Sequence, residues 1–268
     1  MFNFFCKYDK IKENLISPNR QFVKEVVYFD KINSTNAAGK NTDCTANTLF
    51  VAEMQSDGRG RNGRKWISPK GSGVWMSIVT LPKIKVDSVS QITLVAGLAV
   101  CESLNNNFGI DAKIKWPNDI VVDGKKLCGI LTEAVSENGV TKKVIIGIGI
   151  NVNNRSFPKE IRDVATSLRI LISKKSDRTE IINSVLDSIE KYYNVLINEG
   201  NLEKIIEEYK KLCVNIGKEV VTSGAHKVVE GVATDITEKG ELVIQKKDGN
   251  TVAVNSGEVS VRGIYGYI

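Results

Sequence analysis

The chain has 268 residues, 42% of them hydrophobic and 25% charged, so it can bury a full core and form one large domain or a large and a small one. Its net charge of +6 suits an anionic substrate or an acidic protein partner and does not require nucleic acid. There is no run of about 18 apolar residues for a membrane span, and five scattered cysteines without a C-x-x-C pair argue against a disulfide framework or zinc site and predict a cytoplasmic location.

The first part of the chain predicts a lead-in, a strand and a capped helix. Residues 1–25 form a short lead-in without a helix-turn-helix or other DNA-reading unit, and residues 26–29 are typical of a strand. Residues 32–38 then turn into a helix that Ser34 or Thr35 is placed to cap. Capping by itself would explain both hydroxyl groups.

A loop rich in glycine and arginine, residues 57–66, follows the strand predicted at 48–53. Glycines let backbone N–H groups approach a phosphate closely, and guanidinium groups can hold it. The loop lacks the Gly-Lys-Ser/Thr of a Walker motif, and a solvated basic surface loop is the alternative interpretation. If the loop binds an anion, we expect it to be mobile in the empty protein, with unpaired cations, and to close over the ligand.

The middle of the chain predicts a buried helix between strands. Residues 73–80 read as a strand, and residues 89–104 are apolar almost all round, which is typical of a buried core helix. A strand at 112–116 runs into a turn at 117–119.

Two hairpins follow. Asp-Gly at 123–124 joins strands at 120–122 and 125–131, and Asn-Gly at 138–139 leads into a strand at 143–151. Gly147 and Gly149 strip the side chains from one face of that last strand, so either a ligand or another stretch of backbone comes close there.

The rest of the chain predicts two helices and a separate small domain. The helices cover residues 178–197, with Asp177 as cap, and 202–212. Short strands and turns from residue 218 onward favour a small β-barrel, and the one histidine, His226, lies in a polar turn, which argues against a catalytic histidine. We expect a lead-in at 1–25, a catalytic domain at 26–213 and a barrel at 214–268.

Several of these stretches, in this order, closely resemble the catalytic domain of biotin protein ligases over roughly residues 26–212. The closing residues 256–260, with their barrel, resemble the C-terminal domain of that family. The resemblance implies an α+β fold: a mixed or antiparallel sheet backed by helices, as in class II synthetases and biotin ligases, plus a C-terminal SH3-like β-barrel. The stretches that carry it are 34–36, 58–66, 115–119, 126–131 and 147–151.

The resemblance implies a two-step reaction. The biotin carboxylate attacks the α-phosphate of ATP, with Mg²⁺ as the accompanying ion, and gives biotinyl-adenylate and pyrophosphate. A lysine amine of a biotin carboxyl carrier protein domain then takes the biotinyl group and releases AMP. No resident metal site, no membrane association and no specific DNA binding are expected, and a homodimer is left open.

The residues expected around biotin supply polar groups for its ureido ring or space for the ring and chain. Neutral hydrogen-bonding groups suit the ureido ring because buried polar groups left unpaired cost about 1–3 kcal/mol each. Tight strand packing remains the alternative for the glycines. The biotin-binding set is Ser34, Thr35, Asn36, Gln55, Gly58, Arg59, Gly60, Arg61, Lys126, Gly129, Gly147 and Gly149.

Fixed cations are needed because the reaction joins a carboxylate to a phosphate anion. Lys126 matches the lysine that touches both groups in the family and is expected to stabilise charge. Asp119 would orient or deprotonate the incoming lysine, or it only stabilises a turn; Trp66 would cover the ligand, or it only packs in the core. The catalytic set is Lys126, Arg61 and Asp119, and the nucleotide-binding set is Arg61, Arg64, Trp66, Lys115, Asn118 and Asn151, with residues 165–168 nearby.

Two departures from the family pattern and two alternative functions remain. Asn62 stands where many members carry arginine, which predicts weaker adenylate binding, and no winged helix is expected before residue 26, so transcriptional regulation is not implied. A lipoate ligase shares the fold and the acyl-adenylate chemistry but is less similar at the Gly/Arg loop. A nucleic-acid-binding module could use the loop's cations on phosphates.

Overall fold

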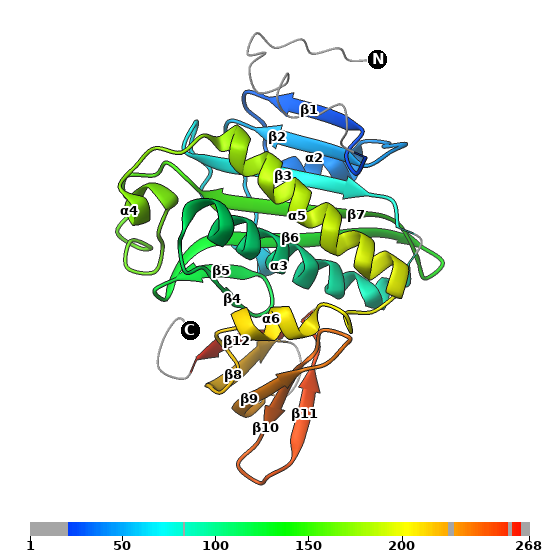
Figure 1. Ribbon diagram of the computed structural model, residues 1–268. Helices are drawn as coiled ribbons and strands as arrows, with labels where there is room; N and C mark the ends of the chain where they lie inside the picture. The colour runs from blue at the N-terminus through cyan, green and yellow to red at the C-terminus, as the bar shows by residue number, and fades with distance from the viewer. Residues whose placement is uncertain (1–20, 83, 225–227, 257–258, 264–268) are drawn as a thin grey trace. The chain divides into compact units, whose positions relative to one another are not determined.

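The computed structural model describes residues 21–82, 84–224, 228–256 and 259–263 (Figure 1). The lead-in up to residue 20, His226 and Gly257-Glu258 of the closing motif therefore lie outside the described residues. The chain divides into two compact units, which interleave along the sequence. The first comprises Met1–Val86, Cys128–Ser156 and Ser167–Leu186, and the second comprises Asp87–Leu127, Phe157–Thr166 and Asp187–Ile268.

The main sheet has seven strands in the order β1-β2-β3-β7-β6-β5-β4. The pairing of β1 with β2 is parallel, while β2–β3, β3–β7, β6–β7 and β4–β5 are antiparallel, so the sheet is mixed. The strands are β1 (Glu25–Phe29), β2 (Thr48–Ala52), β3 (Gly73–Thr80), β4 (Lys113–Lys115), β5 (Asp119–Val122), β6 (Lys125–Glu137) and β7 (Val140–Asn151).

The first unit is built on β1, β2, β3, β7 and most of β6. Helix α2 (Thr35–Asn41) packs against β2, β3 and β7, and it lies behind β2 and β3 in Figure 1. Phe50, Val79 and Ile145 form an apolar cluster beneath it. The first unit also contains the short α4 (Leu168–Ile172) and the start of α5 (Arg178–Glu199).

The second unit contains the buried helix α3 (Val89–Phe108), the β4–β5 pair and α6 (Ile206–Leu212). It also holds a small antiparallel sheet in the order β11-β10-β9-β8-β12. The fold class expected from the sequence is therefore confirmed. The strands of the small sheet are β8 (Glu219–Gly224), β9 (Glu230–Ile236), β10 (Leu242–Gln245), β11 (Thr251–Val254) and β12 (Val259–Gly263).

Local sequence signals set most element ends. Asp123 and Gly124 have φ of 48° and 72°, and Asn138 and Gly139 have φ of 52° and 78°, as the two predicted primed turns require. The helix predicted at 202–212 is shorter than expected, because α6 begins only at Ile206. The residues before it form turns instead.

Candidate functional site

The polar residues at the start of α2 are held against the segment after β2. Ser34 is the cap of the helix, since its Oγ accepts a bond from the N–H of Ala37. The side-chain oxygen of Gln55 accepts the backbone N–H of Thr35 at 2.9 Å and lies 3.2 Å from the Thr35 hydroxyl. Ser34, Thr35 and Asn36 are all buried. Four of the residues expected to bind biotin are thus brought together.

A buried serine that the sequence reasoning missed joins this group. The Ser77 hydroxyl, from the middle of β3, lies 2.7 Å from the Thr35 hydroxyl and 2.6 Å from the amide oxygen of Asn36. The Asn36 amide nitrogen donates to the carbonyl of Leu131 and to the carboxylate of Glu133. A signal was present in the sequence, because Ser77 is the polar residue inside an otherwise apolar run.

The glycines of β7 are explained by two side chains that approach them. A Cβ at Gly147 would overlap the Asn36 amide oxygen, and a Cβ at Gly149 would overlap the indole of Trp66. The groups that come close here are side chains, and not the second stretch of backbone that the sequence offered as the alternative to a ligand. Gly129 lies directly opposite Gly149 in the β6–β7 register.

The Gly/Arg loop is a small hairpin with its own backbone hydrogen bonds. The N–H of Trp66 donates to Gly58 at 2.8 Å, and the N–H of Gly60 donates to Arg64 at 2.7 Å. A Cβ at Gly58 would lie 2.5 Å from the carbonyl oxygen of Trp66, so only glycine fits there. At the tip, Gly63 has a φ of 70°, which again favours glycine.

The sequence predicted that the cations of this hairpin are unpaired, and for Arg59 this prediction is wrong. Arg59 forms a two-point contact with Asp57, with its Nε and a terminal nitrogen 3.2 and 2.9 Å from one carboxylate oxygen. The spacing between them is two residues, so this local pair could have been found in the sequence. The loop's other cations, Arg61, Arg64 and Lys65, lie around its tip and return strand.

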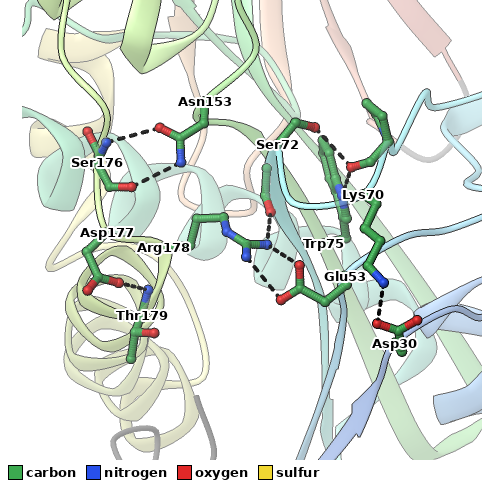
Figure 2. Close-up of polar contacts among 12 residues, drawn as sticks. Asp30, Glu53, Lys70, Ser72, Trp75, Asn153, Ser176, Asp177, Arg178 and Thr179 are labelled. Carbon is green, nitrogen blue, oxygen red and sulfur yellow. Dashed lines mark hydrogen bonds and ion pairs between the residues drawn. The ribbon is translucent and has the colours of Figure 1, made fainter. Parts of the chain in front are cut away.

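A largely buried ion pair joins Glu53, which follows β2, to Arg178, the first residue of α5 (Figure 2). The Arg178 guanidinium reaches both oxygens of Glu53 at 2.9 and 3.0 Å, and it also donates to the carbonyl of Gly73 at 3.3 Å. The two side chains are 21% and 12% exposed. Burial, helped by the nearby Glu53 carboxylate, raises the pKa of Tyr28. The pair connects the end of β2 to the start of β3 and of α5.

A second set of contacts holds the chain just after Asn151, the last residue of β7. The carbonyl of Ser72 accepts the N–H of Asn153 at 2.6 Å, and Asn153 exchanges two bonds with the backbone of Ser176 at 3.0 Å (Figure 2). Asn151 itself is 5% exposed and lies opposite Gly73 in the register. The segment just after Asn151, the residue expected to meet the nucleotide, is therefore held by hydrogen bonds to both Ser72 and Ser176.

The second unit contains a separate charged group. Lys126 and Asp119 form an ion pair at 2.6 Å, with side chains 24% and 15% exposed. Lys115 lies directly opposite Asp119 across the β4–β5 register. The backbone of Lys126 bonds to Val164 and Thr166, so residues 164–166 lie alongside it. Asn118 precedes Asp119 in the turn between β4 and β5.

Arg178 makes a buried contact that its place in the sequence disguised. It is the first residue of α5, where a positive charge opposes the helix dipole, and such a misplaced charge is the signal that could have singled it out. Its partner Glu53 looked like an ordinary end of a strand.

Among the described residues no group of three or more histidine, cysteine or acidic side chains could hold a metal ion. Within the same part of the chain, no helix has both the length and the apolar character needed to cross a membrane.

Comparison with known proteins assigns the chain to a family. The model of the Biotin/lipoate A/B protein ligase family matches residues 26–151, and that of the Biotin protein ligase C terminal domain matches residues 216–262. The Bifunctional ligase/repressor BirA of Bacillus subtilis is 37% identical over 233 residues, which are 84% of this chain and 71% of that protein. The Biotin--[acetyl-CoA-carboxylase] ligase of Mycobacterium tuberculosis is 31% identical over 83% of this chain and 81% of its own length.

The solved structures agree with the sequence matches. The biotin protein ligase from Aquifex aeolicus in complex with biotin and ATP superimposes with a TM-score of 0.79 and 33% sequence identity, and the match covers 90% of this chain and 99% of that one. The fold, both family models and the relatives above 30% identity lead to one assignment. The chain belongs to the biotin protein ligase family.

Proposed function

We propose that the chain joins biotin to a carrier lysine through biotinyl-adenylate. In the first step a biotin carboxylate oxygen forms a bond to the α-phosphorus of ATP, and the bond to the leaving pyrophosphate breaks. In the second step the lysine amine forms an amide with the biotinyl carbonyl, loses a proton, and AMP leaves. The observation that carries this proposal is the likeness of nearly the whole chain to a ligase solved with biotin and ATP.

The group around Thr35 and Gln55 suits the ureido ring of biotin. The ring offers two N–H donors and one carbonyl acceptor, and the hydroxyl and amide groups of this buried cluster can match both kinds. A dithiolane ring offers neither, so it would leave these groups unpaired. That difference favours biotin over lipoate.

The cations supply the electrostatic part of the proposal. Lys126 would stabilise the charge that develops as carboxylate and phosphate join, since it extends from a strand and is held by a 2.6 Å ion pair. Arg61 and Arg64 would grip the phosphate from the hairpin. We assign Asp119 to the incoming carrier lysine, with Lys115 and Asn118 beside it in sequence and register.

ATP would enter with Mg²⁺, the natural acceptor would be a biotin carboxyl carrier protein domain, and the reaction would take place in the cytoplasm. Mg²⁺ is commonly held by one or two carboxylates together with substrate phosphates, so a dedicated cluster of acidic residues is not required. The cysteines of the described residues, Cys44, Cys101, Cys128 and Cys213, are free, which supports a reducing compartment.

The test is pyrophosphate release from ATP and Mg²⁺ with either biotin or lipoate. We expect release with biotin and little with lipoate, followed by gain of one biotinyl group when a carrier domain is added. A site that rejects a substrate lacking its hydrogen bonds can discriminate by about 10⁴-fold. Equal release with lipoate would refute the biotin assignment.

A further inference from the structure

The buried hydroxyl of Ser77 has only one hydrogen, and its partners decide where that hydrogen points. The amide nitrogen of Asn36 faces the Leu131 carbonyl at 3.2 Å and the Glu133 carboxylate at 2.9 Å, and both of these groups only accept. The Asn36 amide oxygen must therefore be the atom that faces Ser77, at 2.6 Å. Because an amide oxygen only accepts, the Ser77 hydrogen goes to Asn36.

This arrangement fixes the next hydroxyl as well. Ser77 and Thr35 are 2.7 Å apart, which is an ordinary O–H···O distance, and one of the two must donate. Ser77 has already given its hydrogen to Asn36, so Thr35 donates to Ser77 and not to the Gln55 oxygen, which is farther away at 3.2 Å and already accepts the Thr35 backbone N–H. Ser77 is 0% exposed and Thr35 is 2% exposed, so little solvent can rearrange these hydrogens.

The partners of the Gln55 amide likewise decide which of its two terminal atoms accepts and which donates. Its oxygen accepts the backbone N–H of Thr35 at 2.9 Å, and its nitrogen donates one hydrogen to Ser68 at 2.9 Å. The second hydrogen of that nitrogen can donate to a ligand, whereas the oxygen of Thr35, with its only hydrogen committed, can accept. A ureido ring presents an N–H donor beside a carbonyl acceptor, which is the matching pattern.

We propose that the chain of side chains Glu133–Asn36–Ser77 makes the Thr35 hydroxyl an obligate acceptor and thereby selects a ring N–H in the substrate. Ser77 and Asn36 are then positioning residues that act through Thr35. Gly147 is part of the same arrangement, because a side chain at this position would overlap the Asn36 amide oxygen and turn the amide away from Ser77. The inference rests on the proposed function and adds the residues that set its substrate selectivity.

The experiment compares biotin with its two cyclic-carbamate analogues, in each of which one ring N–H is replaced by oxygen. Pyrophosphate release gives kcat/KM for each compound, and titration of each compound without ATP gives its affinity. We expect the native protein to prefer biotin over one of the analogues by about a hundredfold or more, because an oxygen facing the Thr35 oxygen is repelled. Ser77→Ala removes the nearest acceptor of the Thr35 hydrogen, which can then turn to the Gln55 oxygen at 3.2 Å or to the ligand, so that preference should fall to about tenfold or less.

Matched variants separate selectivity from folding. Thr141→Ala removes another buried hydroxyl of the first unit, one that bonds to the Pro82 and Ile84 carbonyls, and it should lower stability while leaving the preference unchanged. Glu133→Lys places a donor next to the Asn36 amide and favours its reversal, so the preference should fall several-fold. Glu133→Gln retains an acceptor and should keep the preference.

The outcomes are distinct. An unchanged preference in both Ser77→Ala and Glu133→Lys, with the native protein still releasing pyrophosphate on biotin, would overturn the positioning role and leave the proposed function intact. If Ser77→Ala does not fold, Glu133→Lys alone tests the positioning role. The Glu133 side chain is 35% exposed in the native protein, so we expect its replacement to leave folding intact. A native protein that releases no pyrophosphate with biotin would overturn the proposed function, and the selectivity device with it.

Discussion

Replacing Lys126 by alanine should slow adenylation by about a hundredfold while biotin affinity changes little. The side chain is 24% exposed and ion-paired at 2.6 Å, so its ammonium group is rigidly placed in a partly dehydrated environment. Two unit charges about 3 Å apart attract by roughly 5–6 kcal/mol at an effective dielectric constant of about 20. If about half a unit of charge develops beside Lys126 in the transition state, the loss is about 3 kcal/mol, or about two orders of magnitude in rate.

The assay is single-turnover adenylation with ATP labelled at the α-phosphate, together with titration of biotin in the absence of ATP. Lys125→Ala is the matched control, because Lys125 is the preceding residue of the same strand and is exposed. Its rate should stay close to that of the native protein. A Lys126→Ala rate within about threefold of native would mean that the ammonium group does not face the developing charge. An equal loss in the Lys125 variant would instead indicate a general charge effect.

Three further outcomes test the arrangement of the first unit. Gly147→Ala should raise the KM for biotin at least tenfold, measured by pyrophosphate release, because its Cβ would displace Asn36. Arg178→Met should lower the free energy of unfolding in urea by about 3–5 kcal/mol, since it leaves Glu53 buried without its partner; a loss below about 1 kcal/mol would show that the pair is dispensable. Biotin with ATP should slow tryptic cleavage of the hairpin, and Arg61→Gly should lose much of that protection; identical cleavage with and without ligands would exclude closure of the hairpin over the adenylate.

The sequence was sufficient to predict the elements whose causes are local. The turn at Asp123-Gly124 followed from residues that tolerate positive φ, and α3 followed from its nearly continuous apolar surface. Both signals lie within a few residues of the structure they produce, so no distant partner is needed to interpret them. The order of the residue motifs also led to the family, because motif order can be read from the sequence without knowing any tertiary contact.

Other features were decided only by tertiary structure, since they depend on residues far apart in the chain. The short segment before α6 forms turns, and the N–H of Leu202 at its start donates to the carbonyl of Glu238, a residue distant in the sequence. Position 147 needs a glycine because any Cβ there would overlap the side chain of Asn36, which precedes it by more than a hundred residues. Ser77 gains its role only where β3 passes beneath the start of α2. A sequence shows which groups can donate or accept a hydrogen, but only the fold decides which partner each group meets.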